Sequence, residues 1–458
     1  EEDDDAEEDA DEGDDDPLDL DESVEAVRID LDFPRATPRG TVAITNATLI
    51  TMNGDEVVSR GDIVVTDNRI TALGPSGQVD IPAGAEVFDA TGRYVVPGFI
   101  DTHAHWEFRT HDVLEPQNWS LVANLAYGVT AGLDVQTATN DYFAYQDLVE
   151  TGQSVGQRAF MTGPGVFSNN DFQSYDAVYS YLRRYQEHYR TPNIKSYMVG
   201  TREQRQWVVM ASDSLGLMPT TEGGRDMKLD MTHAIDGMHG NEHTLPLFPF
   251  YDDVVQVYAR TKTAYTPTLL VQYGAPGALP YWLATEEVHD DEKLNRFYPH
   301  NRLDEITRRV SRWARADEYG FAEAAAQAAK IKRAGGLVGV GAHGELQGLG
   351  YHWEMWSLAA GGMTPREVLE AATIDGAEII GIAQDLGSLE VGKLADLVVL
   401  DANPLENVRN TNTVRWVMKN GELYEGDTLT RVWPSRQELT PFWWWSAEPE
   451  TNPAFPRP

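Results

Sequence analysis

The chain has 458 residues, which exceeds one ordinary domain but suits a large α/β barrel of roughly 250 residues or more with a smaller companion domain. It contains no cysteine, so disulfides and thiolate ligands are excluded, and a metal site must use His, Asp, Glu or a modified Lys. The formal net charge of -37 gives a surface that repels nucleic acid and anionic lipid, because both are bound through Lys and Arg, and we expect neither as a partner.

The chain opens with an acidic segment. Its first 22 residues hold 16 Asp or Glu and no Lys or Arg, and we predict that residues 1–35 form an acidic tail or linker. The sequence begins with Glu1 instead of Met and shows no signal peptide, so we expect a trimmed or processed chain. No apolar run approaches the roughly 20 residues that cross a bilayer, and membrane insertion is therefore not expected.

Short β-rich runs separated by turn signals occur near both ends of the chain. They fill residues 41–95 and recur after residue 386, where Asn420-Gly421 is typical of a tight hairpin turn. Neither group is large enough to form a stable sheet domain alone. We therefore predict one small β-sandwich built from residues 36–98 and 386–428.

An apolar run ending near residue 105 presents two histidines. His103 and His105 lie two positions apart, and on a β-strand such residues point to the same side, so both imidazoles can converge on one metal ion. A pair of hydrogen-bonded polar side chains on an exposed strand is the alternative. The four apolar residues and the Pro-Gly before the pair favour a buried parallel strand that delivers ligands at its carboxyl end.

Residues 99–385 alternate short apolar strands with helical stretches. This alternation predicts an α/β fold, a (β/α)8 TIM barrel inserted into the sandwich. Besides the strand before His103, the predicted strands cover residues 127–134, 193–199, 216–221, 238–243, 265–270 and 336–342. The clearest helices are residues 202–215 and 323–333, and residues 280–319 are predicted to be a helical excursion over the barrel mouth.

The last segment, residues 429–458, is a Pro- and Trp-rich tail. It contains three adjacent tryptophans at residues 443–445. We expect this run to pack against a surface of the same fold, with a contact between subunits as the alternative.

The sequence resembles the amidohydrolase superfamily, in particular the branch with imidazolonepropionase-like and prolidase-like enzymes. The resemblance spans most of residues 41–425 and is carried by Pro97-Gly98-Phe99-Ile100-Asp101-Thr102-His103-Ala104-His105 and by the glycine-bounded segment of residues 387–400. It extends to members that carry this module behind a propeller-like domain, which implies an upstream domain and explains the acidic start as a severed linker. The resemblance also implies a homo-oligomer and favours a periplasmic or secreted location, which the residues leave undetermined.

The resemblance implies a ligand set at the carboxyl ends of the barrel strands. His103 and His105 match the two histidines of strand 1, and His243 matches the histidine of strand 6. Lys195 falls where two-metal members carry a carboxylated lysine, whose carbamate oxygens bridge two cations. A lysine paired with a neighbouring acid is the alternative for this position.

Two positions depart from the family pattern. Glu222 stands where strand 5 has His, and a carboxylate is an acceptable ligand for Zn²⁺ or Mn²⁺. His343 stands where strand 8 has the Asp that binds metal and accepts the proton of the attacking water. A neutral imidazole cannot easily do both through one nitrogen, so the proton shuttle needs another group.

Several nearby residues complete the predicted site. His343, Glu345 and His352 are the catalytic candidates, while Tyr197, His239 and Glu354 are predicted to contact substrate. His233 lies close enough in sequence to approach the mouth as well.

These residues predict a metal-dependent hydrolase. One or two divalent ions, zinc first among them, would activate water to attack the carbonyl of an amide, peptide or cyclic amide, so the partner is a small-molecule or peptide substrate. A catalytically degraded barrel with a binding or structural role is the first alternative, because strands 5 and 8 are altered. Hydrolysis of a carbonyl ester, or decarboxylation, is the second.

Overall fold

The structure of this protein is a computed structural model. It describes residues 32–107, 114–137, 142–167, 169–189, 191–197, 200–223, 226–272, 275–308 and 314–445. Residues 1–31 of the predicted acidic tail and residues 446–458 of the predicted Pro/Trp-rich tail lie outside this range. The chain divides into two units, Glu1–Pro34 and Arg35–Pro458, and the strands and helices described here lie in the second. None of the helices in the described part of the chain is long and apolar enough to cross a membrane.

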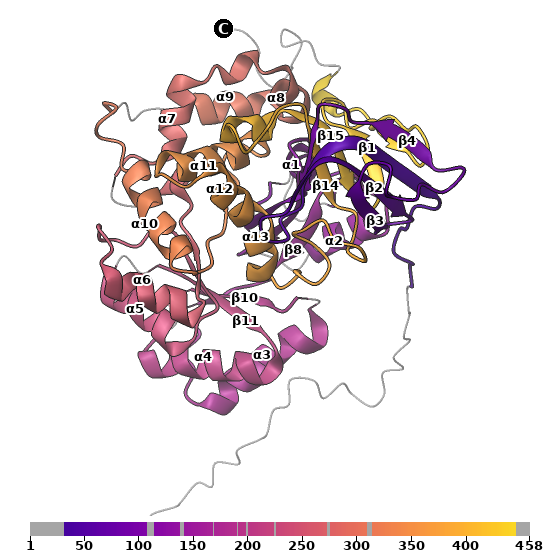
Figure 1. Cartoon of the computed structure of the whole chain (residues 1–458). Coiled ribbons are helices and arrows are strands. Elements are labelled where there is room, and N and C mark those ends of the chain that lie inside the picture. Colours follow the sequence, from indigo (N-terminus) through magenta and orange to yellow (C-terminus); the bar gives the residue numbers. More distant parts are fainter. Residues whose placement is uncertain are drawn as a thin grey trace, which may run out of the picture. The chain divides into compact units, whose positions relative to one another are not determined.

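Strands from both ends of the chain share one nine-stranded sheet (Figure 1). The first group is β1 (Thr41–Ile50), β2 (Val57–Thr66), β3 (Arg69–Pro75), β4 (Glu86–Asp89) and β5 (Tyr94–Pro97), and the second is β14 (Leu397–Leu400), β15 (Val414–Lys419), β16 (Glu422–Glu425) and β17 (Arg431–Trp433). The strand order is β17-β16-β15-β14-β5-β1-β2-β3, and β4 pairs with β1. β17 continues the sheet beyond residue 428, the predicted boundary.

The two groups of strands meet where β14 pairs antiparallel with β5. Val398 lies opposite Val96, and the flanking Val95 and Val399 are both fully buried in the same apolar cluster. The predicted hairpin turn joins β15 and β16, with Asn420 at φ 53° and Gly421 at φ 80°, as a turn with two left-handed central residues requires. The apolar contact between the ends explains why neither half needs to be stable alone.

A second set of strands forms parallel ladders. These strands are β6 (Phe99–Ala104), β7 (Val129–Asp134), β8 (Arg158–Met161), β9 (Val166–Phe167), β10 (Asn193–Tyr197), β11 (Met218–Glu222), β12 (Gly240–Glu242) and β13 (Ala264–Thr266). One ladder runs β6-β7-β8 and the other runs β9-β10-β11-β12-β13. The last predicted strand, residues 336–342, forms only an isolated bridge, between Val338 and Tyr265.

The segment around Val338 joins the two ladders by hydrogen bonds. Tyr265 on β13 donates its N–H to Leu337 at 3.0 Å, and Thr102 on β6 donates to Val340 at 2.9 Å. The strands therefore follow one another continuously from β9 through β13 and β6 to β8. Among the described residues no ladder joins β8 to β9 or β10. The predicted α/β architecture is confirmed, and β8 is a strand that the sequence pattern did not predict.

Helices follow most of these strands. They are α1 (Trp119–Ala126), α2 (Tyr142–Glu150), α3 (Tyr175–His188), α4 (Arg202–Leu215), α5 (Met227–Asp236), α6 (Asp252–Thr261), α10 (Phe321–Arg333), α11 (Leu349–Ala360), α12 (Pro365–Ala372) and α13 (Ile374–Ile379). α4 has the predicted bounds because a Thr201/Gln204 capping box starts it and the left-handed Gly216 ends it. The predicted helical excursion contains α7 (Ala278–Thr285), α8 (Glu292–Phe297) and α9 (His300–Arg308).

The C-terminal tryptophans pack against α8 of the same chain. The indole N–H of Trp444 donates to the backbone carbonyl of Arg296 at 3.1 Å, and Trp444 stacks on Phe442 with ring centroids 4.4 Å apart. The guanidinium of Arg296 lies 4.3 Å from the ring centroid of Trp445, within cation–π range. The expected packing within one fold is confirmed.

A buried ion pair ties the start of β8 to the nine-stranded sheet. Arg158 donates through Nε and Nη2 to the two carboxylate oxygens of Asp396 at 3.0 and 3.1 Å, and Nη2 also reaches Asn420 at 3.2 Å. The Asp396 side chain is only 1% exposed. Such a bidentate pair fixes the geometry of both charges, and removing one partner leaves the other buried and uncompensated.

Asp396→Asn should therefore lower the free energy of unfolding by about 3 kcal/mol. Urea denaturation followed by tryptophan fluorescence measures the change. Asp317→Asn, which removes an exposed partner of Arg315, is the control and should change the same quantity by less than about 1 kcal/mol. Equal effects of the two substitutions would contradict the role given to the Arg158–Asp396 pair.

Candidate metal centre and active site

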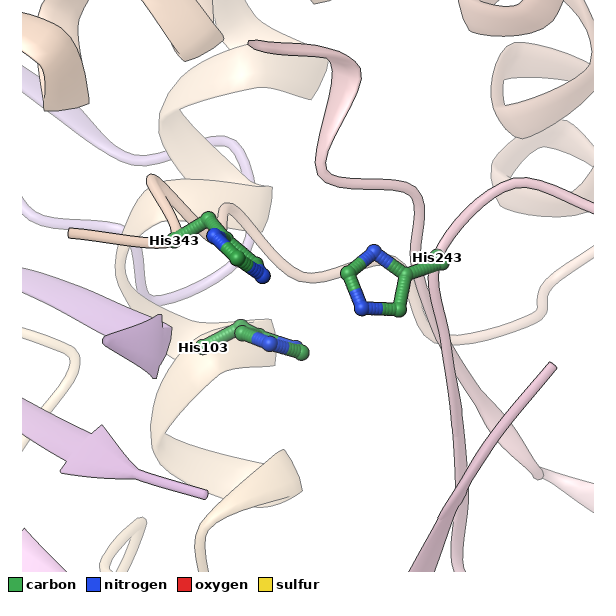
Figure 2. A group of neighbouring side chains, drawn as sticks. All are labelled: His103, His243 and His343. Carbon is green, nitrogen blue, oxygen red and sulfur yellow. The ribbon is translucent and has the colours of Figure 1, made fainter. Parts of the chain in front are cut away.

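Histidines from three separate segments converge at the carboxyl ends of the strands. His103 lies on β6 and His105 follows it, His243 follows β12, and His343 follows the Val338 segment. The ring centroid of His103 lies 4.8 Å from that of His243 and 5.1 Å from that of His343. One nitrogen from each of these three rings lies within 4.8 Å of the others, and Figure 2 shows the rings facing one another. The His105 ring joins the group, 4.7 Å from that of His343.

Backbone strain marks two of these positions. His243 and His343 have φ angles of 70° and 59°, a left-handed conformation that costs a non-glycine residue roughly 1–2 kcal/mol. Hydrogen bonds of 2.8 Å hold both, from His243 N–H to Thr266 and from His343 N–H to the carbonyl of His103. Strain that the surroundings maintain is common at functional sites.

A glycine allows the Val338 segment to approach His103. A Cβ at Gly341 would lie 2.5 Å from the Cβ of His103 and 2.6 Å from Cγ2 of Thr266, closer than real atoms approach. Because glycine has no side chain, the segment can pass directly beside β6. The alternation of Val and Gly at residues 338–341 is therefore explained by this approach.

Each of three histidines has its Nδ1 atom bonded to a buried or half-buried oxygen. Nδ1 of His103 lies 2.7 Å from Glu242 Oε2, and Nδ1 of His105 lies 3.3 Å from Asp134 Oδ1. Nδ1 of His243 lies 2.5 Å from Thr268 Oγ1. Because these partners engage Nδ1, a metal ion would be bound through Nε2 of each ring. Histidines that bind metals almost always have their second nitrogen engaged in this way, so the donor set fits a divalent ion.

Lys195 and Glu222 belong to the same group. Lys195 lies on β10 with its side chain 1% exposed, and its Nζ is 3.3 Å from Glu222 Oε2. The other carboxylate oxygen of Glu222 is 3.5 Å from Nε2 of His243. The pairing of Lys195 with a neighbouring acid, the alternative to a carbamate, is the arrangement that this structure has.

Burial keeps His103 and His343 uncharged near neutral pH. Burial lowers the pKa of His343 to about 3, and the charges of His105 and Lys195 act in the same direction. Burial also holds the pKa of His103 well below its usual range. A neutral imidazole is the form that binds a metal, and a ring with so low a pKa needs no proton release before a cation binds.

Two carboxylates beside the histidines were not among the site residues predicted from the sequence. Glu242 bonds His103 and also accepts a hydrogen bond from Thr220, and Asp101 accepts from the backbone N–H groups of His103 at 3.0 Å and Ala342 at 3.3 Å. Burial raises the pKa of both carboxyls to about 7. A sequence signal exists for each, because Glu242 precedes His243 and Asp101 lies two positions before His103, on the same side of β6.

His352 and Glu354 lie on α11 with partners outside the histidine group. His352 bonds Thr411 Oγ1 at 3.0 Å and the carbonyl of Tyr127 at 2.9 Å, so both ring nitrogens are occupied. The two oxygens of Glu354 accept from the backbone N–H groups of Leu269 and Leu270 at 2.7 and 3.0 Å. Both side chains are fully buried, and these contacts place them in the packing of α11.

The other predicted residues divide between the two ends of the strands. Tyr197 ends β10, two positions after Lys195 and on the same side of the strand. Glu345 lies at the rim of the group, its Oε1 4.0 Å from Nδ1 of His343. His239 precedes β12 and bonds the carbonyl of Ile379 at 2.8 Å, at the end of β12 opposite to His243. His233 lies buried on α5.

Comparison with known proteins identifies related chains. A model of the amidohydrolase family matches residues 338–424. The chain is 48% identical over 71 residues to an imidazolonepropionase of Shouchella clausii. The matched stretch is 15% of this chain and only 16% of that enzyme. It is 23% identical over 445 residues to a 5-methylthioadenosine/S-adenosylhomocysteine deaminase of Desulforamulus reducens. That match covers 85% of this chain and 94% of the deaminase.

A solved structure shares the fold. A Xaa-Pro dipeptidase with methionine bound in its active site superposes with a TM-score of 0.65 at 21% identity, covering 84% of this chain and all of that chain. At this identity the likeness concerns the fold alone.

Glu242→Gln should weaken binding of a divalent ion by about 10- to 100-fold, because the amide no longer fixes the His103 ring as the carboxylate does. Competition with a coloured chelator measures the dissociation constant for Zn²⁺. Glu354→Gln is the matched control, since it changes a carboxyl that is equally buried but bonds backbone N–H groups. An unchanged Zn²⁺ affinity in Glu242→Gln would refute the orienting role of Glu242.

Proposed function

Because the chain belongs to the amidohydrolase superfamily, we propose that it is a metal-dependent hydrolase of a carbon–nitrogen bond in an amide, peptide or cyclic amide. The observation that supports this proposal most strongly is the convergence of His103, His243 and His343 beside His105. One ring nitrogen from each of the first three lies within 4.8 Å of the others. The deaminase and the dipeptidase among the similar proteins both cleave carbon–nitrogen bonds, which supports the bond type. The substrate class, small molecule or peptide, is part of the proposal.

The four histidines and Glu222 are the proposed ligands of one or two divalent ions. Imidazole and carboxylate donors suit Zn²⁺, which we propose as the first choice. When bound, such an ion lowers the pKa of a coordinated water from near 16 toward about 7 and polarises a carbonyl oxygen. Glu242 and Asp134 hold the rings of His103 and His105 in the orientation that this ligation needs.

We assign the proton transfers to Glu345. His343 completes the histidine triad, so with a metal ion bound its ligating nitrogen could not also accept a proton. Glu345 lies behind it at 4.0 Å and is 26% exposed at the rim, where a water or substrate can reach it. Its carboxylate takes the proton of the attacking water and returns it to the leaving nitrogen. Tyr197 is the proposed donor to the carbonyl oxygen of the substrate.

Lys195 has two proposed states. As an ammonium it pairs with Glu222 at 3.3 Å. As a carbamate it would carry a negative charge beside that carboxylate, and two like charges at this distance need a cation between them. We therefore propose that the carbamate forms only when two divalent ions are bound.

The finer architecture and the wider setting are proposals as well. The continuous run of parallel strands from β9 to β8, together with the dipeptidase superposition, supports a closed (β/α)8 barrel with a β-sandwich from both chain ends. An upstream propeller-like domain, a homo-oligomer and a periplasmic or secreted location stay predictions.

Removing the metal should abolish hydrolysis. We expect dialysis against a chelator to reduce the rate on the best amide substrate of a dipeptide and cyclic-amide panel at least about 100-fold, since water without a bound metal ion is a poor nucleophile at neutral pH. Stoichiometric Zn²⁺ or Mn²⁺ should restore the rate. Turnover that survives metal removal would overturn the metal-dependent mechanism, and metal binding without turnover of any substrate would favour a degraded barrel. Faster cleavage of matched esters would favour the ester alternative.

Glu345→Gln should lower kcat by about 10²- to 10⁴-fold, because a carboxamide cannot carry the proton. Steady-state kinetics give kcat, and elemental analysis shows that the metal content is retained. Glu305→Gln, which neutralises an exposed acid on α9, is the control and should leave kcat unchanged. A Glu345→Gln enzyme with wild-type kcat would place the proton transfers on another group.

A further inference from the structure

A cavity of about 440 Å³ lies where the nine-stranded sheet meets the start of β8. Its lining includes four cationic side chains, Arg35, Arg69, Arg158 and Lys419, and two carboxylates, Glu150 and Asp385. This lining contrasts with a chain whose formal net charge is -37.

The three guanidinium groups of the cavity each have a carboxylate partner. The pairs are Arg158 with Asp396 at 3.0 Å, Arg69 with Asp385 at 2.8 Å and Arg35 with Glu150 at 3.1 Å. Their charges therefore cancel one for one. Lys419 is the cation in excess.

Lys419 is buried and has no compensating charge in contact. Its side chain lines the cavity while the residue is only 6% exposed, and no described residue forms a hydrogen bond or ion pair with its amine. Burial and the nearby Arg158 lower its pKa to about 8, although the charges of Asp396, Glu422 and Glu150 act in the opposite direction. Glu422, opposite Lys419 in the β15–β16 hairpin, is engaged by Arg431 at 2.7 Å. A buried ammonium without an anion is unfavourable, so an anion in the cavity would stabilise it.

Further donors face the same region. Arg158 donates to Asp396 and Asn420 through Nε and Nη2, and its Nη1 group takes part in none of these bonds. The amide of Asn420 donates to the carbonyl of Ala36 and accepts from Asn68 at 3.0 Å, which fixes the wall of the cavity. Ammonium and guanidinium donors together match the oxygen atoms of a carboxylate or phosphate group.

We propose that this cavity binds a small oxyanion, a carboxylate or phosphate group, through Lys419 and Arg158. The site is separate from the histidine group. Arg158 begins β8, whereas Met161 at its other end lies opposite Asp134, the partner of His105. The anion would stabilise the junction between the sheet and β8, since a ligand that binds only the folded protein raises its stability.

Thermal melting with sodium phosphate and, in a separate arm, sodium succinate tests this proposal on the purified protein. Sodium chloride at equal ionic strength sets the baseline. We expect a saturable rise in Tm in at least one arm, and the arm that responds identifies the anion. Absence of a saturable rise in both arms would overturn the proposal.

Lys419→Met locates the site. It removes the buried charge but keeps the length of the side chain, so the protein should fold with an equal or higher Tm in chloride. The anion affinity should fall at least tenfold, whereas Lys228→Met, which removes an exposed charge on α5, should keep it. Lys419→Gln, a second neutral variant, should show the same loss. Wild-type affinity in either Lys419 variant would overturn the proposal.

Discussion

The bond between Nδ1 of His103 and Oε2 of Glu242 is the contact on which the site depends. It joins β6 to β12 across 139 residues of sequence, at a distance of 2.7 Å and with both side chains buried. It fixes which nitrogen of His103 faces His243 and His343. Without it the ring could rotate, and the three nitrogens that lie within 4.8 Å of one another would no longer be placed to bind one metal ion.

The charges around this contact are arranged to receive a cation. Burial raises the pKa of Glu242 and Asp101 to about 7 while it lowers that of His343 to about 3. The carboxyls therefore hold protons more tightly, and the imidazoles less tightly, than they do in water. A divalent ion would reverse the first effect, because a nearby positive charge favours ionised carboxylates. This coupling explains why so many titratable groups can share a buried site.

Much of the architecture follows from sequence patterns that burial enforces. His103 and His105 were predicted from the two-residue period of a strand, and α4 has the bounds of the helix predicted over residues 202–215. β8 was not predicted, because its apolar run is only Ala159 to Met161 and follows a charged arginine. Its arginine is only 15% exposed and is neutralised by Asp396, 238 residues away in the sequence. Local pattern cannot reveal a partner so distant.

The site was predictable to a similar limit. The positions of Lys195, Glu222 and His343 came from a resemblance, and the structure brings their side chains to one place. Glu242 and Asp101 were not selected, because an acid on a strand has many ordinary uses. His352 and Glu354 were predicted to belong to the site because they are close to His343 in sequence. In the structure they instead bond Thr411 and the backbone of Leu269, where α11 packs against neighbouring segments. Partner choice for a buried polar group depends on the assembled fold.

An anomalous-scattering map of crystals of the purified protein, recorded above and below the zinc absorption edge, would show directly whether the histidine group binds zinc. We predict a peak about 2.0–2.1 Å from ring nitrogens of His103, His243 and His343, the usual Zn–N distance. A second peak beside Lys195 would indicate two ions. Rings turned away from one another, with no anomalous peak among them in crystals grown with Zn²⁺, would contradict the proposed metal site.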